Sequence, residues 1–260
     1  MIMVQSGGQY PGDKPQADGL GESPNITGQK QLQCLFCSSR LLSFCGSMDT
    51  VELERLDKAR SSFTLEARQS LFDEGQDATH IYNLTSGSVK LYKLLPDGRR
   101  QITGFLFMGD FFGFVGNEKE EYIYSAEALT KTTMCKFPRL EFYKLMTDYP
   151  QIERSILKIA SNELAEAQQQ MLLLGRMTAV ERVASFISML SERAVKRGQK
   201  ANPISVPMGQ IDIGDYLGLT TETVSRSLSR LKKLNILETE LDHKYRILDS
   251  EALKRLTDGD

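Results

Sequence analysis

Residues 151–177 read QIERSILKIASNELAEAQQQMLLLGRM, and the architecture of the chain is built around them. Apolar side chains recur along this stretch at alternating steps of three and four residues, at Leu157, Ala160, Leu164, Ala167, Met171 and Leu174. Such spacing is typical of a coiled-coil seam, where one apolar stripe faces a partner helix. A second stripe, Ile152, Ile156 and Ile159, would pack on the protein's own neighbouring domain. We expect a dimerisation helix over residues 151–178, with a long core helix as the alternative because the repeat is short.

The 260 residues are enough for two ordinary domains. Charged residues make up 25% and the formal net charge is −2, which is typical of a globular protein and leaves nucleic-acid binding to local charge. No apolar run is long enough to span a membrane, and the N-terminus lacks the apolar segment of a secretory signal. Residues 1–30, rich in Gly, Gln, Pro and Asp, are expected to be a disordered tail. These features favour a cytoplasmic protein.

Three of the four cysteines lie in a segment at residues 31–50, as Cys34, Cys37 and Cys45 in a C-x2-C-x7-C pattern, and Cys135 follows far along the chain. Without a secretory signal, cysteines point to metal or redox duty rather than to disulfides. Three close thiolates and one remote thiolate suit a four-sulfur site for zinc or for an iron–sulfur cluster, and the spacing does not choose between them. Two alternatives are a thioredoxin-like pair and four ordinary cysteines, although no βαβ pattern surrounds the pair.

Residues 51–150 predict a domain built from a β-roll. A helix is expected at residues 48–60, and from residue 63 to about residue 137 short strand-like runs alternate with glycine turns. Pro96-Asp97-Gly98 is one such turn, because proline fixes φ, aspartate caps the backbone and glycine permits positive φ. Many short strands at this spacing predict a β-roll or jelly-roll sandwich. A short helix at residues 140–146 then leads through Pro150 into the long helix.

Residues 179–260 predict a winged helix-turn-helix domain. It begins with an amphipathic helix near residue 179, and the helix-turn-helix motif follows. The first helix of the motif covers residues 210–217 and ends at Gly218, and the second runs from about residue 221 to residue 234 with Thr220 as its N-cap. Its outward positions are Thr221, Glu222, Ser225, Arg226 and Ser229, and its basic residues are Arg226, Arg230, Lys232 and Lys233. A single acid on a basic helix with small polar outward positions favours DNA binding over a merely solvated face. Strands at residues 236–241 and 244–248 would form the wing.

In this order of elements the chain resembles the CRP/FNR family of bacterial transcription regulators over about residues 32–256. The segments GDFFGF at 109–114 and YLGLTTETVSRSL at 216–228 carry the resemblance. It implies an α+β fold with an N-terminal cyclic-nucleotide-binding-like β-roll (jelly-roll) sensory domain at residues 51–150, a long dimerisation helix and a C-terminal winged helix-turn-helix. The cysteine set is similar to that of the FNR branch. The third cysteine is spaced as in FnrN/AadR-like members and not as in the enteric C-x2-C-x5-C pattern.

For the cysteines, the resemblance implies one oxygen-labile [4Fe–4S] cluster per subunit, held by Cys34, Cys37, Cys45 and Cys135. It also implies that no cyclic nucleotide binds. The positions that hold the ribose and the phosphate in the nucleotide-binding branch are Phe114 and Tyr124 here, and a tyrosine lacks the charged fork of arginine.

For DNA, the family's reading face falls on Glu222, Ser225 and Arg226, with Thr221 and Arg230 on the same outward surface. Arg226 would bond the O6 and N7 of a guanine, Glu222 would accept from a cytosine amine, and Ser225 would read an A·T pair. The implied target is an inverted repeat resembling TTGAT-N4-ATCAA, bound by a homodimer.

The resemblance therefore predicts a transcription regulator of anaerobic and microaerobic genes, mainly an activator and not an enzyme, that also contacts RNA polymerase. Oxygen would attack the cluster, loosen the seam and release DNA. By resemblance, enteric FNR carries an aspartate at the position of Ala167, where like charges would meet across the dimer. We therefore expect the cluster-free form of this chain to dimerise more tightly than cluster-free enteric FNR, with a less complete oxygen switch. Two alternatives stay open: a regulator of the same fold with zinc or no metal that senses another signal, and a thiol oxidoreductase using Cys34 and Cys37.

Overall fold

The computed structural model describes residues 32–114 and 119–258, so the expected disordered tail at residues 1–30 lies outside the described residues. The cysteine-rich segment forms three short 3-10 turns, η1 (Gln33–Phe36), η2 (Arg40–Leu42) and η3 (Phe44–Ser47). Helix α1 (Thr50–Ala59) follows and confirms the helix predicted at residues 48–60. Asp49 begins it with a capping box, because its side chain accepts from the Glu52 backbone N–H and the Glu52 carboxylate accepts in return.

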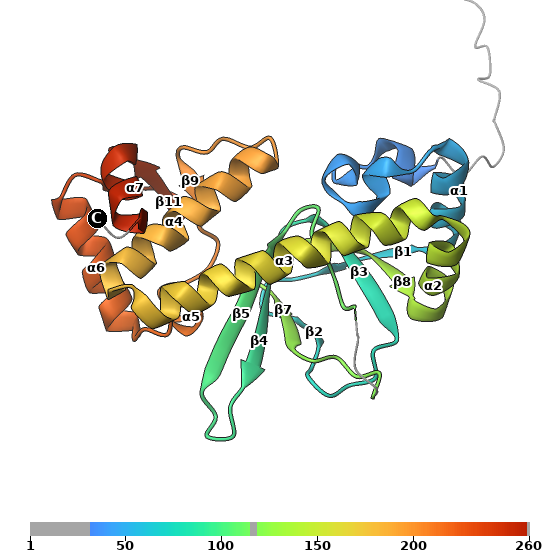
Figure 1. Cartoon of the computed structure of the whole chain (residues 1–260), viewed down its shortest axis with the longest axis horizontal. Coiled ribbons are helices and arrows are strands. Elements are labelled where there is room, and N and C mark those ends of the chain that lie inside the picture. Colours follow the sequence, from blue (N-terminus) through green and yellow to red (C-terminus); the bar gives the residue numbers. More distant parts are fainter. Residues whose placement is uncertain (1–31, 115–118, 259–260) are drawn as a thin grey trace, which may run out of the picture. The chain divides into compact units, whose positions relative to one another are not determined.

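A β-sandwich follows, as predicted. Its strands are β1 (Ser61–Leu65), β2 (Ser70–Phe72), β3 (His80–Ser86), β4 (Ser88–Leu94), β5 (Arg100–Phe107), β6 (Phe111–Phe112), β7 (Ser125–Ala128) and β8 (Thr132–Pro138). Within the described residues they pair antiparallel in two sheets, in the orders β1-β8-β3-β6 and β2-β7-β4-β5 (Figure 1). Buried side chains from both sheets, including Tyr82, Val89 and Met134, form one core between them. Alternating inward residues of paired sheets produce this arrangement.

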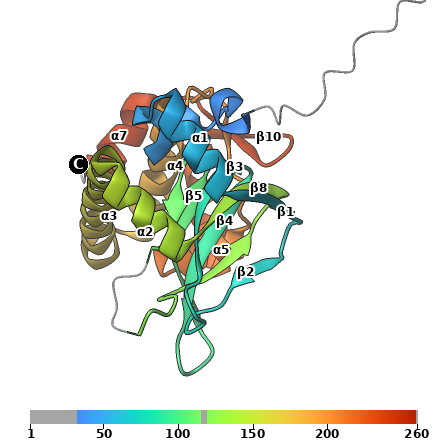
Figure 2. The same cartoon turned by 90° about the vertical axis from the view of Figure 1, so that its right-hand side faces the viewer.

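The long predicted helix is α3 (Pro150–Arg176), which follows α2 (Arg139–Asp148) and begins with Pro150 in its first turn. Its two ends belong to different cores. Ile152 and Ile156 are buried in a cluster with the cysteine-rich segment, while Leu173 is buried with the C-terminal helices. Figure 1 shows α3 between these elements, and Figure 2 shows α1 and α2 near its first turns. The isoleucine stripe therefore packs inward as predicted.

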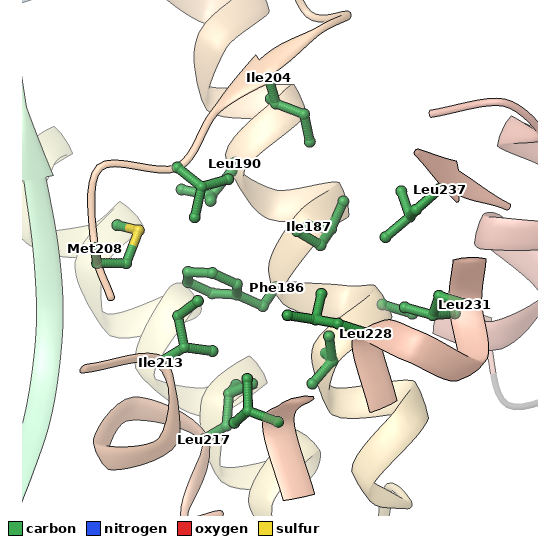
Figure 3. Packing of buried hydrophobic residues seen from close by; sticks show 14 of the residues in the cluster. Phe186, Ile187, Leu190, Ile204, Met208, Ile213, Leu217, Leu228, Leu231 and Leu237 are labelled. Atoms are coloured by element: carbon green, nitrogen blue, oxygen red, sulfur yellow. The ribbon is translucent and has the colours of Figure 1, made fainter. Parts of the chain in front are cut away.

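The C-terminal part contains α4 (Ala179–Lys196), β9 (Ile204–Ser205), α5 (Gln210–Leu217), α6 (Thr221–Lys233), β10 (Leu237–Glu240), β11 (Lys244–Ile247) and α7 (Ser250–Asp258). Both predicted helices of the helix-turn-helix and both predicted wing strands are confirmed. Strand β9 pairs with β11 and adds a third strand to the wing, which the sequence did not predict. In Figure 3, Leu228 and Leu231 of α6 point toward Phe186 and Ile187 of α4.

The fold is thus α+β, as predicted, with a β-sandwich, a long helix and a winged helix-turn-helix in chain order. Among the described helices, none combines the length and the apolar character needed to cross a membrane.

Candidate nucleic-acid interface and metal centre

Helix α6 is positioned by its own sequence. Gly218 ends α5 with φ +63°, a left-handed conformation that suits glycine, and lets the chain turn into α6. Thr220 is the predicted N-cap, since its Oγ1 accepts from the Thr223 backbone N–H at 3.2 Å. Val224, Leu228 and Leu231 are buried, which fixes the rotation of the helix. The opposite face is therefore held toward the solvent.

That free face carries the predicted DNA-reading residues. Thr221, Glu222, Arg226, Ser229 and Arg230 are exposed, and Ser225 is half-buried among them. Lys232 and Lys233 are exposed near the C-terminal end, where Lys232 Nζ lies 5.8 Å from the ring centroid of Tyr245 on the wing strand β11. Near its start, the helix thus offers side chains that can form hydrogen bonds to base edges. Near its end, it offers positively charged lysine side chains. This arrangement suits insertion of the N-terminal half of α6 into a major groove.

The four cysteines lie near one another, although they come from distant segments. Cys34, Cys37 and Cys135 line one pocket of about 330 Å³. Cys45, on η3, lies outside that lining and is buried. Burial first, and then its electrostatic interactions with Cys37 and Cys135, raise the pKa of its thiol. In the described part of the chain all four thiols are free. The structure therefore gathers the residues that the sequence pattern grouped.

The buried thiols of Cys34 and Cys45 are poorly suited to act as redox nucleophiles. Burial raises the pKa of the Cys34 thiol to about 12 and that of Cys45 to about 11. A thiol oxidoreductase needs a readily formed thiolate, which Cys34 does not provide. A metal centre can still use such thiols because binding releases their protons. Among the described residues, no set of three or more His, Cys, Asp or Glu side chains is already arranged around a metal-sized point. Four thiols, three of them around one pocket and the fourth buried close by, nevertheless suit a four-sulfur centre as a donor set.

A larger cavity of about 590 Å³ lies between the β-sandwich and α3, lined by Phe114, Tyr124 and residues of the seam. The Tyr124 hydroxyl accepts from the Gly113 backbone N–H at 3.1 Å. The arginine in the lining is Arg193, which donates to the Phe105 carbonyl at 2.8 Å and pairs with Glu166. Arg193 is therefore already committed to protein partners, and Tyr124 stands where the resemblance would place a phosphate-binding arginine.

The seam of α3 is largely open in the isolated chain. Leu157, Leu164 and Met171 are 67%, 62% and 70% exposed, and Ala160 and Ala167 between them are also exposed. Leu174, the last predicted member, differs because it is half-buried against the core of the C-terminal helices. The exposed stripe thus ends at Met171. Large apolar side chains repeated along one free face indicate an interface.

Two segments of the chain match known protein families. Residues 62–149 match the family described as the cyclic nucleotide-binding domain, and residues 181–256 match the Crp-like helix-turn-helix domain. The chain is 37% identical over 220 residues to the transcriptional activatory protein AadR of Rhodopseudomonas palustris, covering 85% of this chain and 91% of that relative. The chain belongs to the CRP/FNR family of transcription regulators.

Two further similarities agree. This CRP/FNR regulator is 34% identical over 215 residues to an anaerobic regulatory protein of Aggregatibacter actinomycetemcomitans, covering 82% of this chain and 84% of that relative. It aligns with the solved structure of FixK2 from Bradyrhizobium japonicum with a TM-score of 0.70 and 36% identity, over 76% of this chain and 96% of that one. The protein is a transcriptional activator of the CRP/FNR type and not an enzyme, and regulators of this type bind DNA through the helix-turn-helix and typically act as dimers.

Two arginines of this CRP/FNR regulator have roles that the sequence did not reveal. Arg182 of α4 donates to the carbonyls of Leu174, Met177 and Leu217 at 2.8–3.0 Å, and so ties the ends of α3 and α5 together. Arg60, just after α1, reaches into the cysteine pocket. No sequence pattern marks either role. Arg182 bonds backbone carbonyls, and the cysteine partners of Arg60 lie far from it along the chain.

Proposed function

We propose that this regulator is an oxygen-responsive activator of anaerobic or microaerobic genes that carries one [4Fe–4S] cluster on Cys34, Cys37, Cys45 and Cys135. The observation that carries the proposal is the gathering of three cysteines around one pocket with the fourth buried nearby. The similarity to an anaerobic regulatory protein of Aggregatibacter actinomycetemcomitans supports the anaerobic role. When bound, the cluster would supply an oxygen-labile inorganic unit whose loss is the signal.

The residues of this chain connect the cysteine site to the seam. Cys34, Cys45 and Phe44 pack in the same core as Ile152 and Ile156 of α3. Ser47 of η3 and Ser155 of α3 also approach each other, with 3.2 Å between their hydroxyl oxygens. With its cysteines held, the segment stays packed on the first turns of α3, and the exposed stripe keeps its orientation toward a second copy. Release of the cysteines would loosen that packing and weaken the dimer.

In the dimer, each α6 would enter one major groove, and two-fold symmetry requires half-sites about one helical turn apart. We infer an inverted repeat resembling TTGAT-N4-ATCAA, read by Glu222, Ser225 and Arg226. A surface of the β-roll would contact RNA polymerase. Because Arg193 is engaged by protein partners and Tyr124 replaces the phosphate-binding arginine, we also infer that no cyclic nucleotide regulates the protein.

The test is purification without oxygen followed by metal and DNA analysis. A loaded site predicts absorbance at roughly 400 nm with about four iron and four sulfide per chain. The protein should then bind the inverted repeat, and exposure to air should remove both the absorbance and the binding. A colourless protein that contains zinc, or no metal, and binds equally well before and after air would contradict the proposal.

A further inference from the structure

The Arg60 side chain lies among the predicted cluster ligands, although it belongs to neither cysteine segment. Its Nε is 3.2 Å from Cys34 Sγ, and its Nη1 is 3.7 Å from Cys135 Sγ. The side chain is only 7% exposed. Helix α1 ends at Ala59 and β1 begins at Ser61. Arg60 is therefore the single residue between the two elements, and its side chain extends into the cysteine pocket.

The guanidinium is held in this position by three further acceptors. The Asp57 carboxylate, one turn earlier on α1, accepts from Nε at 3.0 Å and from Nη2 at 2.7 Å. Gln33 Oε1 accepts from Nη2 at 2.8 Å, and Ser62 Oγ accepts from Nη1 at 2.6 Å. An arginine fixed at every nitrogen is a built part of the pocket rather than a side chain that happens to fill it.

The donor groups of Arg60 that face Cys34 and Cys135 suit anionic sulfur, while the Asp57 carboxylate on the other side of the guanidinium offsets part of its charge. A neutral thiol is a weak acceptor, whereas a metal-bound thiolate carries negative charge and accepts strongly. Metal coordination would therefore convert the two sulfur contacts of Arg60 into charge-assisted hydrogen bonds. Partners of this kind, outside the ligand set, orient the ligands and tune the metal. For iron–sulfur centres, net charge and hydrogen bonds to sulfur set the reduction potential.

We propose that Arg60 is the counter-charge of the cluster: it donates to the sulfurs of Cys34 and Cys135 and protects the site against oxidation. This inference rests on the proposed function. A fixed positive charge favours the state with more electrons, because that state is more negative. Arg60 therefore raises the reduction potential and makes removal of an electron by oxygen less favourable. It is a positioning residue, since it acts through the ligand sulfurs.

The experiment compares Arg60→Gln, Arg60→Lys and Arg55→Gln with the wild type, all purified without oxygen. Arg55→Gln is the matched control, because Arg55 is also on α1, but its side chain is 60% exposed and lies 3.7 Å from Asp148 at the surface. For each protein we would measure iron and sulfide per chain, the reduction potential, and the half-life of the absorbance in air-equilibrated buffer.

We expect Arg60→Gln to lower the potential and to shorten the half-life in air by about 10-fold, the lower end of typical losses when such a partner is removed. Arg60→Lys, which keeps the charge, should lie between Arg60→Gln and the wild type, and Arg55→Gln should match the wild type. If the wild type holds a cluster but Arg60→Gln keeps its half-life and potential, the inference is wrong and the proposed function stands.

Other outcomes separate the two proposals further. A wild type without iron and sulfide overturns the proposed function and, with it, the role of Arg60. If Arg60→Gln holds no iron, Arg60→Lys decides: recovery of iron supports the charge role. Loss of iron as complete as in Arg60→Gln assigns Arg60 a merely structural role and overturns the inference.

Discussion

Arg226 Nη1 lies 3.7 Å from Glu222 Oε1, one turn away on the solvent face of α6. Both side chains are exposed, so the pair adds little to stability. It does set two side chains of opposite hydrogen-bonding character side by side where a groove would receive them. Arg226→Ala is expected to cost about 1–3 kcal/mol on the inverted repeat and to relax the preference at one base pair. Fluorescence anisotropy on the repeat and on single-base variants measures both effects.

Lys233→Ala provides the comparison for Arg226→Ala on the same helix. A phosphate contact carries no sequence information, so this change should weaken binding to every sequence and reduce the salt slope by about one unit. Equal losses on the repeat and on scrambled DNA for Arg226→Ala would remove Arg226 from base reading.

Each cysteine is expected to be necessary for the proposed cluster. Cys34→Ser, Cys37→Ser, Cys45→Ser and Cys135→Ser should each abolish iron and sulfide binding, because the cluster needs four thiolates and the chain has four cysteines. Iron and sulfide assays on protein purified without oxygen give the answer. A variant that keeps the wild-type content would show that its cysteine is not a ligand.

Phe44 anchors the cysteine-rich segment in the core. Its ring lies 4.9 Å from that of Phe111 and 5.2 Å from that of Phe142, centroid to centroid, and the residue is 1% exposed. Phe44→Ala should lower the free energy of unfolding by about 3–5 kcal/mol. Phe36→Ala is the control, since Phe36 is in the same segment and 75% exposed. Urea unfolding curves that shift equally for both variants would show that Phe44 is not an anchor.

Gly87, between β3 and β4, is expected to accept a side chain only at a large cost in stability. Its φ is +83°, and a Cβ there would come within 2.5 Å of the Lys131 carbonyl oxygen. Gly98 has the same φ of +83° with nothing within 4 Å of its Cβ position. Gly98→Ala should therefore lower the free energy of unfolding by about 1–2 kcal/mol, because only the strain of placing alanine in a left-handed conformation opposes it. Gly87→Ala should cost about 1–3 kcal/mol more from overpacking. Equal unfolding midpoints would contradict the clash.

The features that the sequence predicted depend on local patterns. Ile152 and Ile156 face inward because helical periodicity places them there, and Thr220 caps α6 because the cap bond spans three residues. Apolar alternation and glycine turns predicted the β-sandwich in the same way. The spacing grouped Cys34, Cys37 and Cys45 and left Cys135 as the one remote thiol. The resemblance to the FNR branch then predicted that all four belong to one site.

The features that the sequence did not predict depend on contacts far along the chain or on very short elements. Arg60 meets Cys34 and Cys135 across 26 and 75 residues, and no periodic pattern encodes such a meeting. Strand β9 has two residues, too few for a period. Leu174 fits the seam repeat, yet it packs partly inward because Arg182 ties the end of α3 to the C-terminal helices.

The dimer switch is expected to depend on Ala167. This residue is exposed on α3 between Leu164 and Met171, whose large apolar side chains are also exposed. A two-fold interface brings each seam position close to its own copy, so a charge at residue 167 would meet a like charge. Ala167→Asp should therefore shift the cluster-free protein toward monomer by about 1–3 kcal/mol per dimer, a range typical of coupling energies. Sedimentation equilibrium on the apo-protein measures the change.

Ala165→Asp is the matched control for Ala167→Asp. Ala165 is exposed two residues earlier, about 200° around the helix from Ala167, so the same new charge would lie off the seam. It should leave the dimer constant close to that of the wild type. Because Ala167 brings no repulsion, the wild-type apo-protein should also stay dimeric at lower concentration than Ala167→Asp, and its release from DNA in air should be less complete. If both aspartate variants show the wild-type dimer constant, Ala167 is not at the two-fold contact and the seam register is wrong.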